Sequence, residues 1–230
     1  MKKTKKIVTL CVALCLITLW VIRVVYINVT FDGIKEKVYS MDQTVEYEED
    51  FYETMVDFDY RKGYSIKVNS ATLYTIEQYM EEHDIRDGDL KLVYNYYSAP
   101  DPEDVYIPEF VYDIEVTITA DQSITQSRSG ESAAGISLWD TMAISTNSRL
   151  TVSTPIFGLV YPDIGDVLGF AVRPGTSMTL HFPLVADVLI ANNGTDYTYD
   201  YLTNEDFYLL LSQYPTKKMI KLELTENKVI

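Results

Sequence analysis

The two histidines are the most specific of the residues in this chain that could do chemistry. His83 lies at the end of an expected short helix, and His181 lies in an expected strand, where its side chain could point to either face. Neither belongs to an HExxH or HxH pattern, and no cysteine follows Cys15, so the usual zinc-ligand spacings are missing. We therefore expect both histidines to be structural or solvated, with no catalytic role and no bound metal.

Hydrolytic chemistry has no clear motif either. A serine hydrolase needs a nucleophile on a strained turn and a histidine base, commonly within G-x-S-x-G. That motif is absent, and Ser129 lies in a polar stretch without a preceding apolar strand. A carboxylate-dependent glycosidase needs two acids at a set separation, but with 34 acidic residues a pair can always be chosen. We therefore predict a non-enzymatic protein without a cofactor.

Two acidic clusters make calcium an alternative to this expectation, because hard cations prefer carboxylate oxygens. Arg86 occupies the third place of the first cluster, which does not fit an EF-hand, and the second cluster lacks a glycine at its turn. The candidate ligands are Asp84, Asp87 and Asp89 in the first cluster and Asp101, Glu103 and Asp104 in the second.

The elements that must position these side chains are mostly strands. Between residues 112 and 118, Tyr, Ile, Val and Ile alternate with polar residues, which predicts a strand with one buried and one wet face. Thr75 and Gln78 form a capping-box pattern, so a helix is expected from Thr75 to about His83. Further strands are expected over residues 63–73, 90–97, 135–145, 149–154, 169–172, 178–184, 207–211 and 219–224.

Many short strands with one convincing helix are typical of an all-β domain. We predict a mainly β fold, an antiparallel immunoglobulin-like sandwich with one short helix, preceded by a transmembrane helix. The expected organisation is a basic tail (1–6), a transmembrane signal anchor (7–26), an acidic stalk or entry segment (27–62), of which parts could dock as an edge strand, and the β-sandwich domain (63–230).

The N-terminal residues predict a membrane anchor and its orientation. Residues 7–26 are apolar except near the far end, and about 20 helical residues span roughly 30 Å, the thickness of a bilayer core. Four lysines precede this run and only Arg23 lies near its far end, so the N-terminus is expected in the cytoplasm. A cleaved signal is disfavoured because no A-x-A-like site follows. A lipoprotein is disfavoured because leucine precedes both Cys11 and Cys15.

The charge distribution excludes one class of partner. All 34 acidic residues follow residue 26, whereas five of the 19 basic residues precede it. Such an acidic domain lacks the basic footprint that nucleic-acid binding requires. The 19 tyrosines of the chain, all but Tyr26 beyond the span, and its many aliphatic residues oppose disorder. We expect a folded domain outside the cell membrane that binds no nucleic acid.

Several segments resemble a known family. GYSIKVNSATLYTIEQYMEEHD, VYDIEVTIT, SMTLHFPL and YPTKKMIKLEL are similar to an uncharacterised domain-of-unknown-function family of membrane-anchored extracytoplasmic proteins from Gram-positive bacteria. The resemblance covers most of residues 32–224. It implies an immunoglobulin-like extracytoplasmic domain and assigns no site residues.

The favoured hypothesis is a single-pass, membrane-anchored module that binds a protein or envelope component outside the cell. Tyrosine is enriched in interface cores, so exposed tyrosines are candidate contacts. These are Tyr94, Tyr96, Tyr97 and Tyr106. The alternatives are an accessory subunit of a membrane complex such as a transporter, with Cys11, Cys15 and Thr18 facing a partner span, and a carboxylate-dependent envelope hydrolase.

Overall fold

The computed structural model describes residues 2–30, 33–48, 61–90, 107–124, 135–138, 140–146, 148–164, 169–186 and 198–229. The chain forms two compact units, Met1–Lys35 and Glu36–Ile230.

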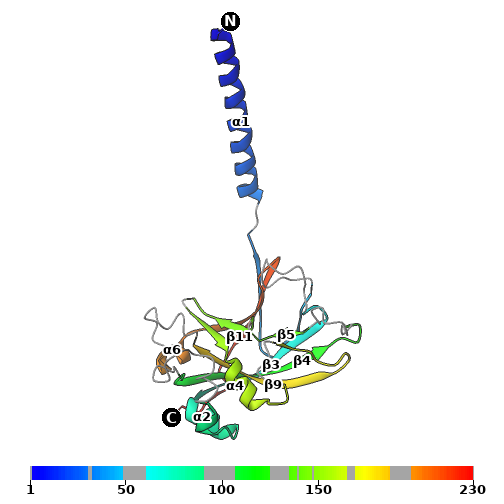
Figure 1. Cartoon of the computed structure of the whole chain (residues 1–230), viewed down its shortest axis with the longest axis vertical. Coiled ribbons are helices and arrows are strands. Elements are labelled where there is room, and N and C mark those ends of the chain that lie inside the picture. The colour runs from blue at the N-terminus through cyan, green and yellow to red at the C-terminus, as the bar shows by residue number, and fades with distance from the viewer. Residues whose placement is uncertain are drawn as a thin grey trace. The chain divides into compact units, whose positions relative to one another are not determined.

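The first unit is the helix α1 (Lys2–Thr30), shown in blue in Figure 1. Its apolar side chains between Val12 and Val29 are not buried inside the molecule. By length and composition this helix could anchor the chain in a membrane, although a signal sequence has the same properties. The helix begins five residues before the predicted span 7–26 and ends four residues after it.

The second unit is built on a ten-stranded sheet that curls (Figure 1). Its strand order is β1-β11-β10-β6-β7-β9-β4-β3-β12, and β2 also pairs with β3. The strands are β1 (Lys35–Tyr39), β2 (Val45–Glu46), β3 (Tyr64–Thr75), β4 (Phe110–Ala120), β6 (Met142–Ile144), β7 (Arg149–Val152), β9 (Ser177–Ala186), β10 (Phe207–Ser212), β11 (Thr216–Leu222) and β12 (Glu226–Asn227). A separate pair joins β5 (Ile136–Ser137) to β8 (Gly169–Phe170), and the helices are α2 (Ile76–Glu82), α4 (Thr154–Val160) and α6 (Tyr199–Asn204).

The prediction of a mainly β fold is confirmed, but the immunoglobulin-like sandwich is not. A sandwich packs two separate sheets face to face, whereas most of the described strands pair in one continuous order. Tyr112 on β4 and Phe207 on β10 are not on neighbouring strands, yet their ring centroids lie 5.6 Å apart. The sheet therefore curls around its own core.

A β-bulge in β3 keeps its apolar residues on the core side along the whole strand. Ile66 and Val68 are buried before the bulge, and Ala71 and Leu73 are buried after it. The members of each pair are two positions apart, but Val68 and Ala71 are three positions apart. The register shift between Val68 and Ser70 resets the alternation, because a bulge inserts one unpaired residue. Asn69 is that residue, and its side chain is exposed.

The predicted helix from Thr75 is confirmed. Thr75 is its N-cap, and the reciprocal capping box with Gln78 is formed. The predicted strand 149–154 ends early because Ser153 accepts a hydrogen bond from the Ile156 backbone and caps α4, a helix that the sequence analysis missed.

The other predicted strands differ mainly at their ends. The segments 178–184, 207–211 and 219–224 correspond to β9, β10 and β11, and 169–172 contains β8. The segment 135–145 contains two strands, β5 and β6, instead of one. Residues 87–90 are helical, so Leu90 does not begin a strand. The rest of the predicted strand 90–97 lies outside the described residues.

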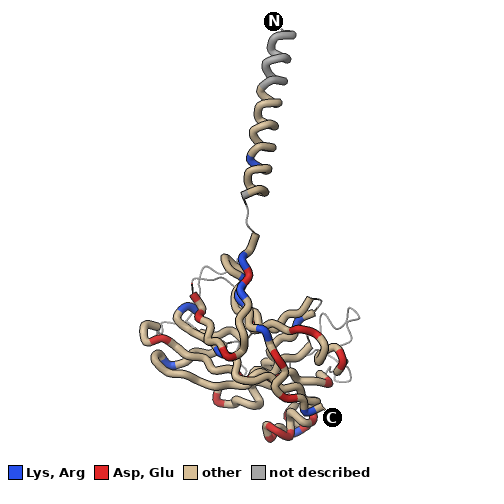
Figure 2. Tube along the Cα trace, turned by 180° about the vertical axis from the view of Figure 1, so that it is seen from behind, with Lys and Arg blue, Asp and Glu red and all other residues tan. Residues whose placement is uncertain are grey.

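Part of the segment 27–62 pairs with the sheet, as predicted for an edge strand. β1 lies at one edge beside β11, and β2 is antiparallel to β3. Lys217 on β11 forms an ion pair with Glu36 on β1 at 3.0 Å. Acidic residues occur on many separate segments of this unit (Figure 2).

Two helices cover part of the outer face of the sheet. Tyr74, Val111 and Val185 on the strands pack against Tyr79 of α2 and Ile156 of α4 in a second apolar cluster. The alternation of residues 112–118 predicts that the outer face of β4 is solvent-exposed along its length. The structure differs, because the helices cover part of this face. Where α2 covers β4, Asp113 is only 3% exposed.

Candidate functional site

The C-terminal end of α2 carries the first residue of the site. His83 is the C-cap, and the following residue, Asp84, has a φ of 55°. The backbone N–H of Asp84 donates to Glu81 O, and that of Ile85 donates to Met80 O, which is the hydrogen-bond pattern of a Schellman motif. This local structure ends the helix and fixes the backbone from which the His83 side chain extends.

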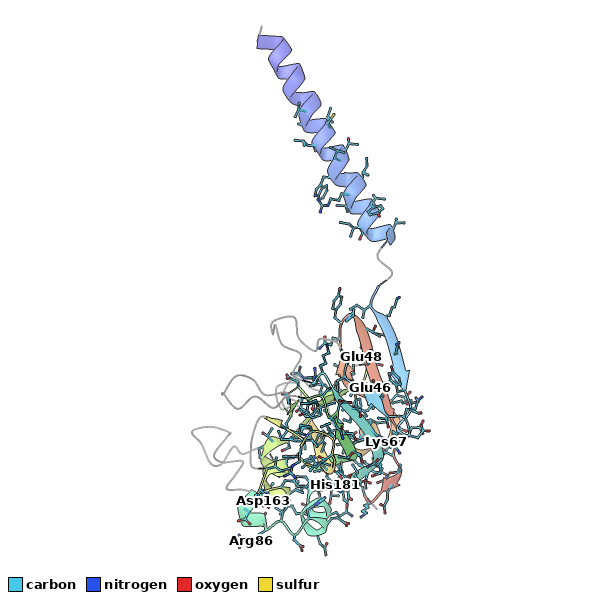
Figure 3. The ribbon with its side chains drawn as sticks, turned by 90° about the vertical axis from the view of Figure 1, so that its right-hand side faces the viewer. Glu46, Glu48, Lys67, Arg86, Asp163 and His181 are labelled. Carbon is cyan, nitrogen blue, oxygen red and sulfur yellow. The ribbon has the colours of Figure 1, made fainter. Side chains whose placement is uncertain are left out.

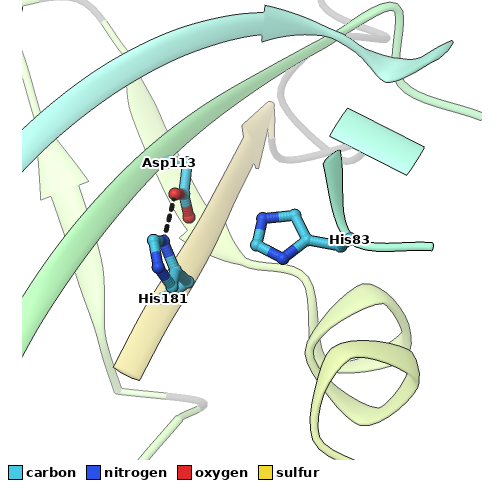
Figure 4. Close-up of side chains that lie close together, drawn as sticks. All are labelled: His83, Asp113 and His181. Atoms are coloured by element: carbon cyan, nitrogen blue, oxygen red, sulfur yellow. Dashed lines mark hydrogen bonds and ion pairs between the residues drawn. The ribbon is translucent and has the colours of Figure 1, made fainter. Parts of the chain in front are cut away.

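Two adjacent strands supply the other residues. Glu115 on β4 lies opposite His181 on β9, and Asp113 lies opposite Pro183, so Asp113, Glu115 and His181 share the outer face of the sheet. Nδ1 of His181 donates a hydrogen bond of 2.6 Å to Oδ2 of Asp113. In Figure 4 the His83 ring faces this pair. Figure 3 shows His181 between the end of the domain that carries Glu48 and the end that carries Arg86.

The backbone around His181 is also held in place. The N–H of His181 donates a 2.7 Å hydrogen bond to the hydroxyl of Tyr161, the C-cap residue of α4. The rings of His83 and His181 meet edge to face with centroids 5.2 Å apart. Nε2 of His181 lies 3.8 Å from Oε2 of Glu115. The site therefore joins α2, β4 and β9, with α4 supporting it from one side.

Three buried polar atoms in this region have no hydrogen-bond partner within the described residues. They are the hydroxyl oxygen of Tyr79, Nε2 of His83 and Oδ1 of Asp113. A buried polar atom without a partner costs about 1–3 kcal/mol, so such atoms are few in folded proteins. Their concentration at one place distinguishes this site from the rest of the described domain.

The two histidines respond to the site in opposite ways. The hydrogen bond from His181 to Asp113 raises the pKa of His181, which outweighs the effect of burial. Burial lowers the pKa of His83, and this effect outweighs the nearby Asp113 carboxylate, which raises it. Burial, and then the charge of the nearby Asp113 carboxylate, raise the pKa of Tyr79 well above its usual value. Tyr79 therefore stays neutral at ordinary pH.

The site can accept a ligand through nitrogen and oxygen atoms together. One potential ligand atom from each of His83, Asp113 and His181 lies within 4.8 Å of the others. Among the described residues, these are the side chains that converge in a set of three or more possible metal ligands. Sequence reasoning treated the histidines separately and did not select Asp113. No local motif connects them, since strand pairing and helix docking bring them together.

The acidic residues of the first candidate calcium cluster make other interactions in the structure. The Arg86 guanidinium donates two hydrogen bonds to the Asp89 carboxylate, at 2.7 and 3.0 Å. Asp84 supplies the positive φ that ends α2, and Asp87 also has a partner. These three carboxylates do not converge with the histidine site. The second calcium cluster, Asp101, Glu103 and Asp104, and the candidate contacts Tyr94, Tyr96, Tyr97 and Tyr106 lie outside the described residues.

Comparison with known families identifies the domain that carries this site. Residues 36–218 match the model of a domain of unknown function, DUF5028. The chain belongs to the DUF5028 family. The matched range includes His83, Asp113 and His181, and most of the curled sheet. Comparison with curated proteins and with solved structures gives no significant match.

Membership in DUF5028 confirms the resemblance to an uncharacterised family, and it leaves a Gram-positive source and an immunoglobulin-like fold without support. The family description names no activity, so the function must be argued from the site itself.

Proposed function

We propose that this DUF5028 protein is a single-pass, membrane-anchored module that binds a ligand outside the cell through the site between α2, β4 and β9, without catalysis. The N-terminus lies in the cytoplasm and the β domain lies outside. The binding role rests on His83, Asp113 and Tyr79, each of which has a buried polar atom with no hydrogen-bond partner among the described residues. A ligand atom of His83 converges with one of Asp113, and the Tyr79 ring lies against the His83 ring. A polar ligand would satisfy these atoms together.

The anchor part of the proposal rests on α1. Its apolar side chains are exposed between Val12 and Val29, and four lysines precede its apolar run. Lysines resist transfer across the membrane, which favours an inside N-terminus. The β domain then lies outside the cell, where its lack of cysteine makes it independent of redox conditions.

A carboxylate-dependent hydrolase receives less support from the same site. Such an enzyme needs two acids that converge on a substrate. Asp113 is buried and already accepts a hydrogen bond from His181, and Glu115 lies on the other side of the same imidazole. An accessory subunit of a membrane complex is compatible with the proposed binding role, since its partner would contact either the span or the domain.

We expect single-cysteine labelling to place the domain outside the cell. The chain has no cysteine after Cys15, so a cysteine introduced at the exposed Glu77 is the sole one in the β domain. In protoplasts, Glu77→Cys should react with a membrane-impermeant maleimide while the cells are intact. Thr4→Cys should react only after lysis, and the unaltered chain gives the background from Cys11 and Cys15.

Two outcomes would contradict the proposal. If Thr4→Cys reacts in intact protoplasts and Glu77→Cys does not, the orientation is inverted. If the protein is recovered from the medium with an N-terminus near Asn28, α1 is a cleaved signal and the anchor does not exist.

A further inference from the structure

The unpartnered atoms and the ligand types of the site point to one class of occupant. We propose that His83, Asp113 and His181 bind a divalent first-row transition-metal ion, for which Zn²⁺ is the reference. This inference rests on the proposed function, because it names the ligand of the same site. It assigns to the two histidines a role that their isolated positions in the sequence do not indicate.

The donor set selects this class of ion. Two imidazole nitrogens and one carboxylate oxygen are the three protein ligands of many zinc and non-haem iron centres, which leave further positions open for water or another ligand. Calcium and magnesium prefer six or more oxygen ligands. His83 and His181 therefore favour a borderline metal over a hard one.

The distances are compatible with one ion. Zinc binds nitrogen and oxygen at about 2.0–2.2 Å in a tetrahedral arrangement, so neighbouring ligand atoms lie about 3.3–3.6 Å apart. The potential ligand atoms of the three residues already lie within 4.8 Å of one another. Side-chain adjustments of about 1–1.5 Å would bring them into range. An ion held by Nδ1 of His181 would also replace the proton that this nitrogen donates to Asp113. A rearrangement of the sheet is not needed.

The surroundings provide charge, access and support. Asp113 is 3% exposed and brings a negative charge into a largely apolar setting, where a cation lowers the cost of burial. The His181 side chain is 33% exposed, so an ion can reach the site from the outer face of the sheet. Glu115 lies beside that opening, 34% exposed. Its carboxylate adds negative charge that attracts a cation to this side of His181.

The competing explanation is a structural ion pair with a buried water. His181 and Asp113 already form a short hydrogen bond. One water could bond to the remaining atoms of Tyr79, His83 and Asp113, since buried waters make two to four hydrogen bonds. Unlike a metal ion, a water would not make the stability of the protein depend on added zinc or on a chelator.

The test uses the full chain, purified in detergent and stripped with a chelator. Isothermal titration with Zn²⁺ should give one ion per chain, and zinc should raise the melting temperature. His83→Gln, Asp113→Asn and His181→Gln should each weaken zinc binding by more than about 100-fold, because even outer-shell partners of a metal are worth 10–100-fold. Ca²⁺ at the same concentration should not compete. Co²⁺ should give the visible d–d absorption of a site with protein ligands.

Asp89→Asn is the matched control, because Asp89 is also an acid near α2 but pairs with Arg86. It should bind zinc as the unaltered chain does. Melting of each metal-free variant separates loss of binding from loss of folding. If one ligand variant does not fold, the other two still decide the question. An absence of zinc binding, or equal binding by all the variants, overturns the proposal.

Native mass spectrometry of the protein isolated from membranes distinguishes this inference from the proposed function. An added mass of one metal ion that disappears in His181→Gln supports both the metal site and the binding function. A larger bound ligand that disappears in the same variant supports the binding function and overturns the metal assignment. If the Glu77→Cys experiment places the domain inside the cell while zinc still binds, the metal site stands and the extracytoplasmic function fails.

Discussion

At the scale of single residues, Lys218 shows how the domain buries a charge. Its side chain is 4% exposed, and its ammonium group bonds to the Glu48 carboxylate at 2.8 Å and to the Glu46 carbonyl at 3.3 Å. The hydrogen bond from Lys218 lowers the pKa of Glu48. A carboxyl whose pKa is lower in the folded state stabilises the fold above its ordinary pKa, and this contribution is lost as the pH falls through the lowered value.

We therefore expect Glu48→Gln to lower the free energy of unfolding near neutral pH, by no more than about 1 kcal/mol because Glu48 is largely exposed. The difference from the unaltered chain should shrink below pH of about 4, as Glu48 becomes protonated in both states. Urea unfolding of both proteins at neutral pH and below pH of about 4 measures this difference in free energy. Glu36→Gln, which breaks the more exposed pair with Lys217, should have a smaller effect. An equal loss at both pH values would rule out the charge pair as the cause.

At the scale of elements, α2 depends on the backbone conformation of Asp84. A positive φ is unfavourable for most L-residues, especially β-branched ones, and glycine adopts it readily. We expect Asp84→Gly to keep or raise the melting temperature, and Asp84→Val to lower the stability by about 1–2 kcal/mol. Thermal unfolding of the two variants tests this. If both variants were equally destabilised, the side chain of Asp84 and not its φ would be important, as the calcium alternative requires.

At the scale of the whole β domain, the C-terminal residues form the edge strand beside β3 and also contact α2. β12 pairs in parallel with β3. The Lys228 backbone accepts a hydrogen bond from the Gln78 side chain at 2.6 Å and donates one to Leu73. The Lys228 ammonium forms an ion pair with Glu82, next to His83, at 3.0 Å. β12 and Lys228 lie beyond the region matched by the family model, which ends at residue 218.

Truncation after Thr225 should therefore destabilise the domain and loosen α2. Several net hydrogen bonds of about 1 kcal/mol each are lost, so we expect a decrease of roughly 2–4 kcal/mol in the free energy of unfolding. Hydrogen exchange should increase in residues 76–83. Lys228→Met removes the partly exposed ion pair with Glu82 and the cation–π contact with Tyr74, and should cost no more than about 1 kcal/mol. Unchanged exchange in α2 after truncation would show that the helix does not depend on the C-terminal residues.

Features that depend on neighbouring residues could be predicted from the sequence alone. The capping box of Thr75 and Gln78 predicted α2, because both hydrogen bonds form within one turn. The alternation around Ile114 predicted β4, and the length of the N-terminal apolar run predicted a helix able to span a membrane. The bulge at Asn69 and the N-cap Ser153 are also local, but their side chains fit several other local structures, so they were not predicted.

The curl of the sheet and the arrangement of the site could not be predicted, because both depend on contacts between distant segments. His83, Asp113 and His181 are far apart in the chain, and no spacing rule relates them. They meet because β4 and β9 pair in a register that places Glu115 opposite His181, and because α2 packs on the outer face beside them. Strand register and helix docking are set by burial of apolar surface between distant segments. Burial of apolar surface does not depend on how far apart two segments are in the sequence. A local sequence pattern therefore does not show which polar residues will become neighbours.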